Sequence, residues 1–310
     1  MLLFDIREPI NAVSHGAGMM LALPVTWLLW KRCGARNPCG ISPSCPVANA
    51  CAAVGGTCRT ARHYRLKALS LLVFGISLAF CYAASTLFHA APWHGESLSV
   101  LQRLDHMGIY LLIAGTYTPI TWAMLRGAWL SGTLATVWTI TAVCVARVWY
   151  GGVLPIWVST LVYLAMGWGS LICYRELARR YSHRTLLPLP LGGIFYSVGA
   201  VMNLAKWPVL SPGVFAAHEL FHFFVIAGSA CHIIFMLNVV IPAPGPVLVP
   251  APVRSRSRSP LLLLRWARAR LSRWVRQWMT HIPHPRWLEE VLAAGEALES
   301  VGAEGPAEVV

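Results

Sequence analysis

The chain is poor in charged residues, and above all in acidic ones. Asp, Glu, Lys and Arg make up 12% of its 310 residues, whereas soluble domains carry roughly 25%. Only 12 residues are acidic against 25 basic ones. The basic residues cluster in loops and in one tail, which favours contact with lipid headgroups over nucleic acid binding. With 56% hydrophobic residues and 14 tryptophans, the composition argues against a soluble protein and predicts an integral membrane protein.

The sequence also lacks the alternating ten-residue segments of a membrane β-barrel. A basic N-terminal segment typical of a cleavable signal peptide is missing too, because Asp5 and Glu8 stand in its place. Instead, seven apolar runs reach the length of about 20 residues that a helix needs to cross a bilayer. We therefore expect an all-α integral membrane protein, a bundle of seven transmembrane helices. The expected spans are 11–31, 68–90, 105–125, 129–148, 154–174, 186–205 and 214–241.

The chain divides into four parts by composition. Residues 1–31 hold the N-terminus and the first span, and residues 68–241 hold spans two to seven. Between them, residues 32–67 are rich in Cys, Gly and Pro and are expected to form a flexible loop insertion. Residues 242–310 begin with a Pro-rich linker and continue into a tail where Arg alternates with Leu and Trp. This pattern suits an amphipathic helix on anionic lipid headgroups, although a disordered tail is the alternative.

The nine cysteines form two groups. Four of them stand singly in apolar runs and are expected to pack as small hydrophobic side chains. Five others crowd into the insertion without a CxxC pair, which disfavours a zinc ribbon, and their odd number leaves the pairing open. The first group is Cys81, Cys144, Cys173 and Cys231, and the second is Cys33, Cys39, Cys45, Cys51 and Cys58.

Three histidines lie where a membrane helix rarely carries a titratable group. His89 closes the second span, and His218 and His222 stand four apart near the start of the seventh. An ionisable residue inside a span is a functional-site hypothesis by default. Residues at i and i+4 share a helix face, a spacing that suits two ligands of one metal ion. The expected topology places the end of span two and the starts of spans three and seven at one membrane face, so Asp105 joins the three histidines there.

Three imidazoles leave a fourth tetrahedral position on Zn²⁺ for water, which zinc activates as a nucleophile. Asp105 can accept the proton of that water or orient it, and Ser85, four residues before His89, can donate a hydrogen bond. The competing interpretation is that each polar side chain only bonds to a neighbouring helix. HELFH, residues 218–222, also matches the zinc-protease pattern HExxH.

Other polar residues near the predicted site are less informative. Glu8, Asn11 and His15 follow one helix stripe in EPINAVSH, and they either line the mouth of the site or satisfy the helix end. His106 points away from Asp105 and is expected to contact a neighbouring helix. His232 lies about 15 Å beyond His222 along its helix, too far to share the same metal ion. It is expected to be a packed histidine.

Four segments in combination resemble the progestin and adipoQ receptor family, and within it the hemolysin III branch. They are EPINAVSH, YAASTLFHAAP, LQRLDHMGIYLLIAGTYTPITW and HELFHFFVIAGSACHI. The family is similar to a wider group of seven-span metal-dependent hydrolases that includes alkaline ceramidases. The resemblance implies Zn²⁺ held by His89, His218 and His222, with Asp105 and Ser85 contacting the water that zinc activates. It also implies that HELFH belongs to this site rather than to a protease.

The leading functional hypothesis is an intramembrane zinc hydrolase that cleaves a lipid amide or ester bond. A receptor or signalling scaffold with a structural zinc is a second hypothesis, and a cytolysin-like membrane-perturbing protein is a third. The orientation in the membrane has two conflicting indications. Outside the tail, Lys and Arg divide 4 against 12 between the two faces, which favours an external N-terminus. The resemblance to adiponectin receptors implies a cytoplasmic one.

Overall fold

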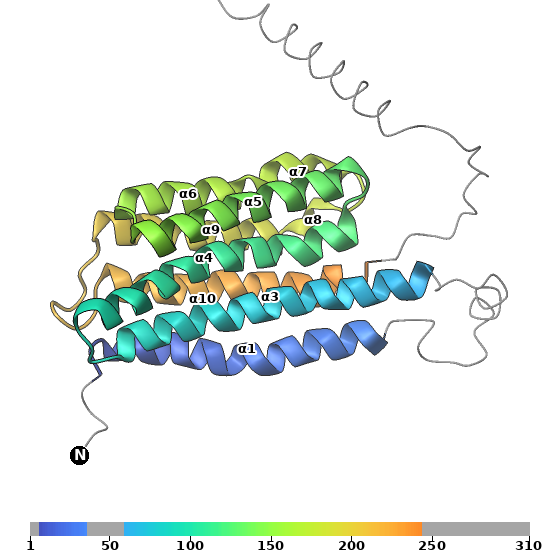
Figure 1. Ribbon diagram of the computed structural model, residues 1–310. Helices are drawn as coiled ribbons and strands as arrows, with labels where there is room; N and C mark the ends of the chain where they lie inside the picture. The colour runs from blue at the N-terminus through green and yellow to red at the C-terminus, as the bar shows by residue number, and fades with distance from the viewer. Residues whose placement is uncertain (1–5, 36–58, 244–310) are drawn as a thin grey trace, which may run out of the picture. The chain divides into compact units, whose positions relative to one another are not determined.

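A computed structural model describes residues 6–35 and 59–243 of the chain. Apart from one isolated β-bridge between Ser211 and Phe215, the regular structure of these residues is helical. The helices run roughly along one common axis (Figure 1). They are α1 (Pro9–Ala35), α3 (Arg59–Ala90), α4 (Gly95–Met124), α5 (Ala128–Gly151), α6 (Ile156–Trp168), α7 (Ser170–Ala178), α8 (His183–Leu186), α9 (Pro188–Ala205), α10 (Ala217–Phe235) and the π-helix η1 (Met236–Val240).

Six of these helical stretches are long and apolar enough to cross a membrane. They are α1, α3, α5, α6 with α7, α8 with α9, and α10 with η1. The fold is therefore that of an all-α, multi-pass integral membrane protein, as the composition predicts. The remaining expected span, the third one at 105–125, corresponds to α4, which has 30 residues but falls outside those six. This helix carries Glu96, Arg103 and Asp105 in its first turns, and all three lower its apolar character.

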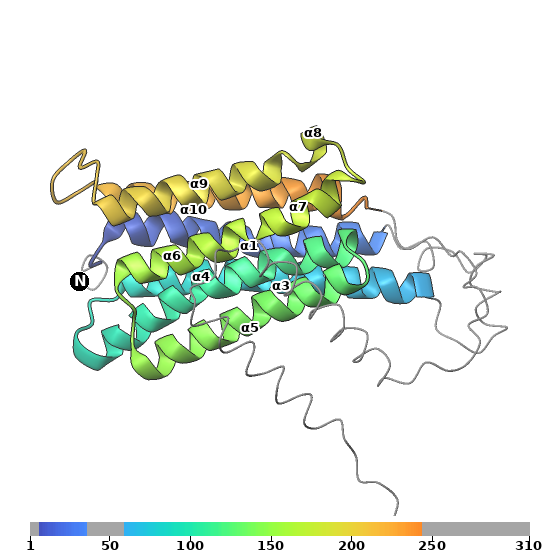
Figure 2. The same cartoon turned by 90° about the horizontal axis from the view of Figure 1, so that it is seen from above.

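Several helices that follow one another in the chain lie side by side. In Figures 1 and 2, α1, α3, α4 and α5 form one succession of neighbours, and α9 runs beside α10. Helix α10 also packs against α1, which brings the seventh expected span back to the first. Because neighbours alternate in direction, the starts of α1, α4 and α10 and the end of α3 lie at the same end of the bundle (Figure 1).

Glycines let α3 approach α1 and α4 closely. A Cβ added at Gly75 of α3 would clash with the Thr26 side chain on α1, and one at Gly115 of α4 would clash with the Ser77 hydroxyl. Small residues at helix contacts are the usual means of close approach in membranes, where packing rather than the hydrophobic effect drives association.

The predicted insertion differs from the structure at both of its ends. Helix α1 continues to Ala35, so Cys33 is a buried residue of a helix rather than of a loop. Helix α3 begins at Arg59, nine residues before the expected limit of its span. Residues 36–58, with the other four cysteines of the insertion, and residues 244–310 of the tail lie outside the described part of the chain.

Lys67 explains why α3 extends so far. Its side chain is fully buried, and its Nζ donates hydrogen bonds to the carbonyls of Ile241 (2.7 Å) and Ala243 (2.8 Å). The last carbonyls of a helix have no partner within the helix and attract cations. Lys67 therefore joins the start of α3 to the end of the last span, at the end of the bundle opposite to His89.

Candidate metal centre

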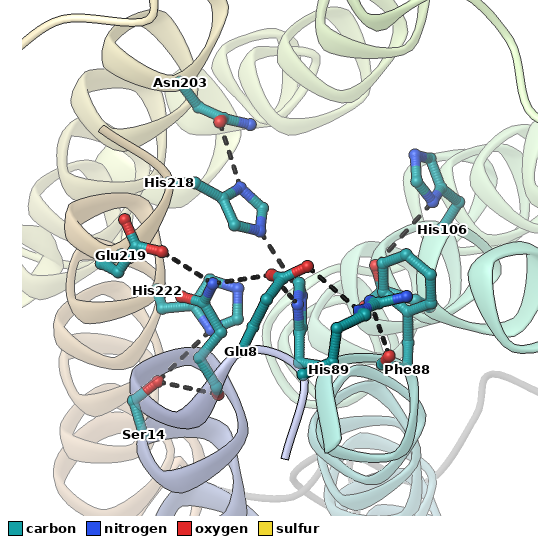
Figure 3. A network of polar contacts seen from close by, with 12 residues as sticks. Glu8, Ser14, Phe88, His89, His106, Asn203, His218, Glu219 and His222 are labelled. Carbon is teal, nitrogen blue, oxygen red and sulfur yellow. Dashed lines mark hydrogen bonds and ion pairs between the residues drawn. The ribbon is translucent and has the colours of Figure 1, made fainter. Parts of the chain in front are cut away.

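Three histidine side chains from two helices converge at one end of the bundle (Figure 3). His89 comes from α3, and His218 and His222 come from α10. One potential ligand atom of each lies within 4.8 Å of those of the other two. The Nε2 atoms of His89 and His218 are 3.4 Å apart. His89 and His222 are buried and His218 is partly buried. The group can therefore hold a metal ion.

The local sequence accounts for this convergence. His89 is the penultimate residue of α3, while His218 and His222 occupy the first two turns of α10. The i, i+4 spacing places the two α10 rings on one face, one turn apart. Since the end of α3 and the start of α10 lie at the same end of the bundle, this face meets His89. The co-location expected from the order of the spans is confirmed for the three histidines.

The Nδ1 atom of each ring has its own polar partner. The His89 Nδ1 lies 2.6 Å from Glu8 Oε2, the His218 Nδ1 lies 3.1 Å from Asn203 Oδ1, and the His222 Nδ1 lies 3.3 Å from Ser14 Oγ. The single proton of the Ser14 hydroxyl is donated to the carbonyl of Asn11. Its oxygen must therefore accept the Nδ1–H of His222. Glu8 and Asn203 likewise offer acceptor oxygens, so all three Nδ1 atoms are assigned as protonated.

This assignment leaves the lone pair on Nε2 of every ring. At the 3.4 Å between the Nε2 atoms of His89 and His218, the two lone pairs repel each other unless a cation lies between them. A metal-binding histidine typically donates its other N–H to a carboxylate, a carbonyl or another acceptor, which fixes the tautomer and the orientation of the ring. The donor set and its partners therefore fit a metal ion that accepts imidazole ligands.

A chain of hydrogen bonds connects the helices that carry the cluster. Asn11 on α1 donates one amide hydrogen to Glu8 Oε2 (3.0 Å) and the other to Glu219 Oε1 on α10 (2.9 Å). The other Glu219 oxygen accepts the backbone N–H of Ala216 (2.8 Å), at the start of α10. Glu219 is thus engaged in fixing the helix start, which disfavours the protease interpretation of HELFH, where this residue would act as a base.

The contact with His89 also sets the charge of Glu8. This hydrogen bond, supported by Asn11 and Arg7 and opposed by partial burial, lowers the pKa of the Glu8 carboxyl to about 2. Glu8 therefore stays a carboxylate throughout the physiological pH range. Of the two interpretations open for Glu8 from the sequence, contact with the site is the one that the structure favours.

Asp105 and Ser85 lie near the cluster. Asp105 of α4 shares with His218 the wall of an internal cavity, and its carboxylate lies 3.8 Å from His106 Nδ1. Ser85 is buried on α3, one turn before His89 and on the same face. The His106 Nδ1 also lies 2.9 Å from the carbonyl of Gln102, one turn back in its own helix. His232 is buried further along α10, with Nε2 3.3 Å from the carbonyl of Leu189.

The cavity has a volume of about 520 Å³. Its lining comes from α3 to α7, α9 and α10 and is mostly apolar, with Ile109, Ile113, Leu164 and Phe221 among its residues. His218, Asp105 and Asn203 are polar members of that lining. The cavity therefore connects the histidine cluster to an apolar interior large enough for part of a small molecule or a lipid chain.

Asn203 is a residue of the site that sequence reasoning missed. It stands in the last turn of α9, fifteen residues before its partner His218, beyond a loop. A lone amide in an otherwise apolar span was the signal that could have found it. The sequence shows Ser14 only as a member of EPINAVSH, whereas in the structure its hydroxyl contacts the Nδ1 of His222.

These features define a helical, multi-pass membrane protein with a buried three-histidine cluster that can bind a metal ion. The family described as haemolysin-III related matches residues 5–233. The chain belongs to this family, which confirms the resemblance seen in its motifs.

The relatives include bacterial and eukaryotic proteins. A hemolysin-3 homolog of Bacillus subtilis is 30% identical over 243 residues, which cover 78% of this chain and 99% of the relative. Hemolysin-3 of Bacillus cereus is 32% identical over 248 residues, 77% and 94% of the two chains. The ADIPOR-like receptor IZH2 of Saccharomyces cerevisiae is 25% identical over 181 residues, 51% and 55% of the two chains.

Proposed function

We propose that this protein is a zinc-dependent membrane hydrolase that cleaves an amide or ester bond of a lipid. The observation that carries the proposal is the arrangement of the three histidines. One potential ligand atom of each ring lies within 4.8 Å of those of the other two, the Nδ1 atoms have other polar partners, and His218 also lines an apolar cavity. Two nitrogens on a tetrahedral zinc with Zn–N bonds of about 2.0–2.1 Å would be about 3.3 Å apart. The Nε2 atoms of His89 and His218 are 3.4 Å apart.

In this proposal His89, His218 and His222 hold the zinc. When bound, zinc would supply Lewis acidity, which polarises a carbonyl and makes water a nucleophile near neutral pH. The Asp105 carboxylate, on the cavity wall, would accept the proton of the attacking water and return it to the leaving amine or alcohol. The Ser85 hydroxyl would donate a hydrogen bond to the carbonyl oxygen as negative charge develops there. The apolar cavity would hold the lipid chain and exclude water.

A receptor or scaffold with a structural zinc is the second candidate. It is supported by the name of the yeast relative and by the hydrogen bonds that tie α1, α3, α9 and α10 together around the histidines. The names of the Bacillus relatives suggest membrane lysis as a third candidate. Only the first candidate requires turnover of a lipid.

Zinc content and lipid turnover test the proposal together. The full chain, purified in detergent, is expected to contain about one zinc per molecule, and His89→Ala or His222→Ala is expected to lose it. His183→Ala is the matched control, because His183 is exposed on α8 and contacts Tyr174. Reconstituted protein is then incubated with mixed sphingolipids and phospholipids, and released fatty acid is measured by mass spectrometry.

The outcomes separate the candidates. Fatty acid release that disappears in His222→Ala supports the hydrolase. Zinc without turnover of any lipid in the mixture would contradict it and favour the receptor. A wild-type protein without zinc would contradict both, and leakage of lipid vesicles without zinc would favour lysis.

A further inference from the structure

The three histidines differ in the charge of their outer partners. Ser14 and Asn203, the partners of His222 and His218, are neutral, whereas His89 is paired with the carboxylate of Glu8 at 2.6 Å. Charge-assisted hydrogen bonds are shorter than neutral ones and roughly twice as strong. The imidazole of His89 is therefore held more firmly than the other two rings.

Glu8 does not belong to a helix, yet its position is fixed at several points. Its backbone N–H donates to the carbonyl of His89 (3.0 Å). The neighbouring Arg7 donates to the carbonyl of Phe88 (2.7 Å), and its guanidinium lies 4.4 Å from the centroid of the Phe88 ring. Arg7 also pairs with Glu8 Oε1 at 3.2 Å. Hydrogen bonds and an aromatic contact thus hold the segment before α1 against the last turn of α3, next to His89.

Asn11 aims the carboxylate of Glu8 from the other side. It is almost fully buried, and its two amide hydrogens are donated to Glu8 and to Glu219. Because both acceptors are carboxylate oxygens, the orientation of the amide is determined by its partners. Asn11 therefore sets the distance between the segment that holds His89 and the helix that carries His218 and His222.

We propose that Glu8 is a positioning residue for the metal centre, that it acts through His89, and that Asn11 aims it. This inference rests on the proposed zinc site. By accepting the Nδ1–H of His89, the carboxylate directs the Nε2 lone pair toward the other two rings and makes the imidazole a stronger ligand. Outer partners of this kind typically contribute 10- to 100-fold to metal affinity.

A competitive zinc titration of the purified full chain, with a chromogenic chelator, tests the proposal. Glu8→Gln keeps the size of the side chain but removes its charge, and it is expected to weaken zinc binding by about 10- to 100-fold. Glu96→Gln is the matched control, because Glu96 is an exposed carboxylate in the first turn of α4 at the same end of the bundle. This variant is expected to bind zinc like the wild type.

Thermal unfolding distinguishes positioning from general stabilisation. A ligand that binds the folded state raises the Tm by an amount that grows with its affinity. If Glu8 positions His89, the zinc-induced rise in Tm shrinks in Glu8→Gln. If Glu8 only stabilises the fold, Tm falls equally with and without zinc, the affinity stays unchanged, and the proposal is overturned. A wild-type chain that binds no zinc overturns the metal centre itself and this inference with it.

A double substitution tests the part assigned to Asn11. Asn11→Ala is expected to weaken zinc binding, because Glu8 loses the donor that aims it. If Asn11 acts through Glu8, the variant that carries Asn11→Ala and Glu8→Gln binds zinc about as well as Glu8→Gln alone. Losses that multiply would show that the two residues act independently, and this would overturn the role of Asn11.

Discussion

The ring of His15 stacks on the ring of His222, with the centroids 3.7 Å apart and the planes inclined by 20°. His15 lies on α1 and is buried, and its second ring neighbour is Tyr82 at 4.9 Å. Neither of its ring nitrogens has a hydrogen-bond partner within residues 6–35 and 59–243. The flat ring, rather than its nitrogens, is therefore what His222 contacts, and it limits rotation of the His222 ring.

A phenylalanine in place of His15 is accordingly expected to stack on the His222 ring as well as histidine does. His15→Phe keeps the stacked ring and removes two buried polar atoms, so zinc affinity should stay the same and Tm should stay the same or rise. His15→Ala leaves a void beside His222 and should lower the free energy of unfolding by about 2–4 kcal/mol. Zinc titration and thermal unfolding measure both effects. A loss of zinc in His15→Phe as complete as in His222→Ala would instead assign a nitrogen of His15 to the metal.

The position of the three histidines was predictable because it depends on few quantities. The number of spans and their alternating direction bring the end of α3 and the start of α10 to one end of the bundle. The spacing of His218 and His222 then fixes their common face. These relations follow from the lengths of apolar runs and the pitch of a helix, so small errors in the helix boundaries did not affect them.

Contacts that depend on helix rotation were not predictable in this way. Whether Asn203 of α9 faces His218 depends on the rotation of each helix about its axis, which packing decides. Lys67 gives a second example. It stands at the end of the segment 32–67, whose Cys, Gly and Pro content predicts a loop, and the two carbonyls to which it donates lie about 175 residues further along the chain. No local pattern contains that information.

The contact between Gly75 and Thr26 predicts a severe effect of one added methyl group. A Cβ at residue 75 would clash with Thr26 Oγ1 and lie 2.6 Å from Thr26 Cβ. Gly75→Ala should therefore force α1 away from α3 and lower the free energy of unfolding by about 1–3 kcal/mol. Unfolding curves of the purified variants, followed by circular dichroism, provide the measurement.

An exchange of the two residues provides the control for Gly75. Combining Thr26→Gly with Gly75→Ala moves the side chain to the other helix and should recover most of the lost stability. Gly132→Ala has no atom within 4 Å of the new Cβ and lies in the first part of α5. It should change stability slightly, and in the favourable direction, because Ala is the better helix former. Equal destabilisation at residues 75 and 132 would show that close helix approach is not the cause.

Lys67 is expected to stabilise the fold without affecting the metal centre. Lys67→Met retains the aliphatic stem but leaves the carbonyls of Ile241 and Ala243 without their donor, which should cost about 2–4 kcal/mol. The 22 residues between Lys67 and His89 correspond to about 33 Å of helix, so zinc affinity should not change. Lys206→Met, at an exposed lysine after α9, is the matched control and should be neutral. If Lys67→Met unfolds like the wild type, the Lys67 ammonium does not stabilise the contact between the start of α3 and the end of the last span.

A substitution of Asp105 is the clearest way to separate zinc binding from catalysis. Its carboxylate borders the cavity and is not one of the three groups that come within 4.8 Å of one another. In the proposed hydrolase it accepts a proton, so Asp105→Asn should retain zinc at the wild-type level and lower kcat by about 10²- to 10⁴-fold with little change in KM. Zinc content and fatty acid release are measured on the same preparation. If zinc is lost together with turnover, Asp105 is a ligand rather than a base; if neither changes, the proton is accepted elsewhere and this assignment of Asp105 is wrong.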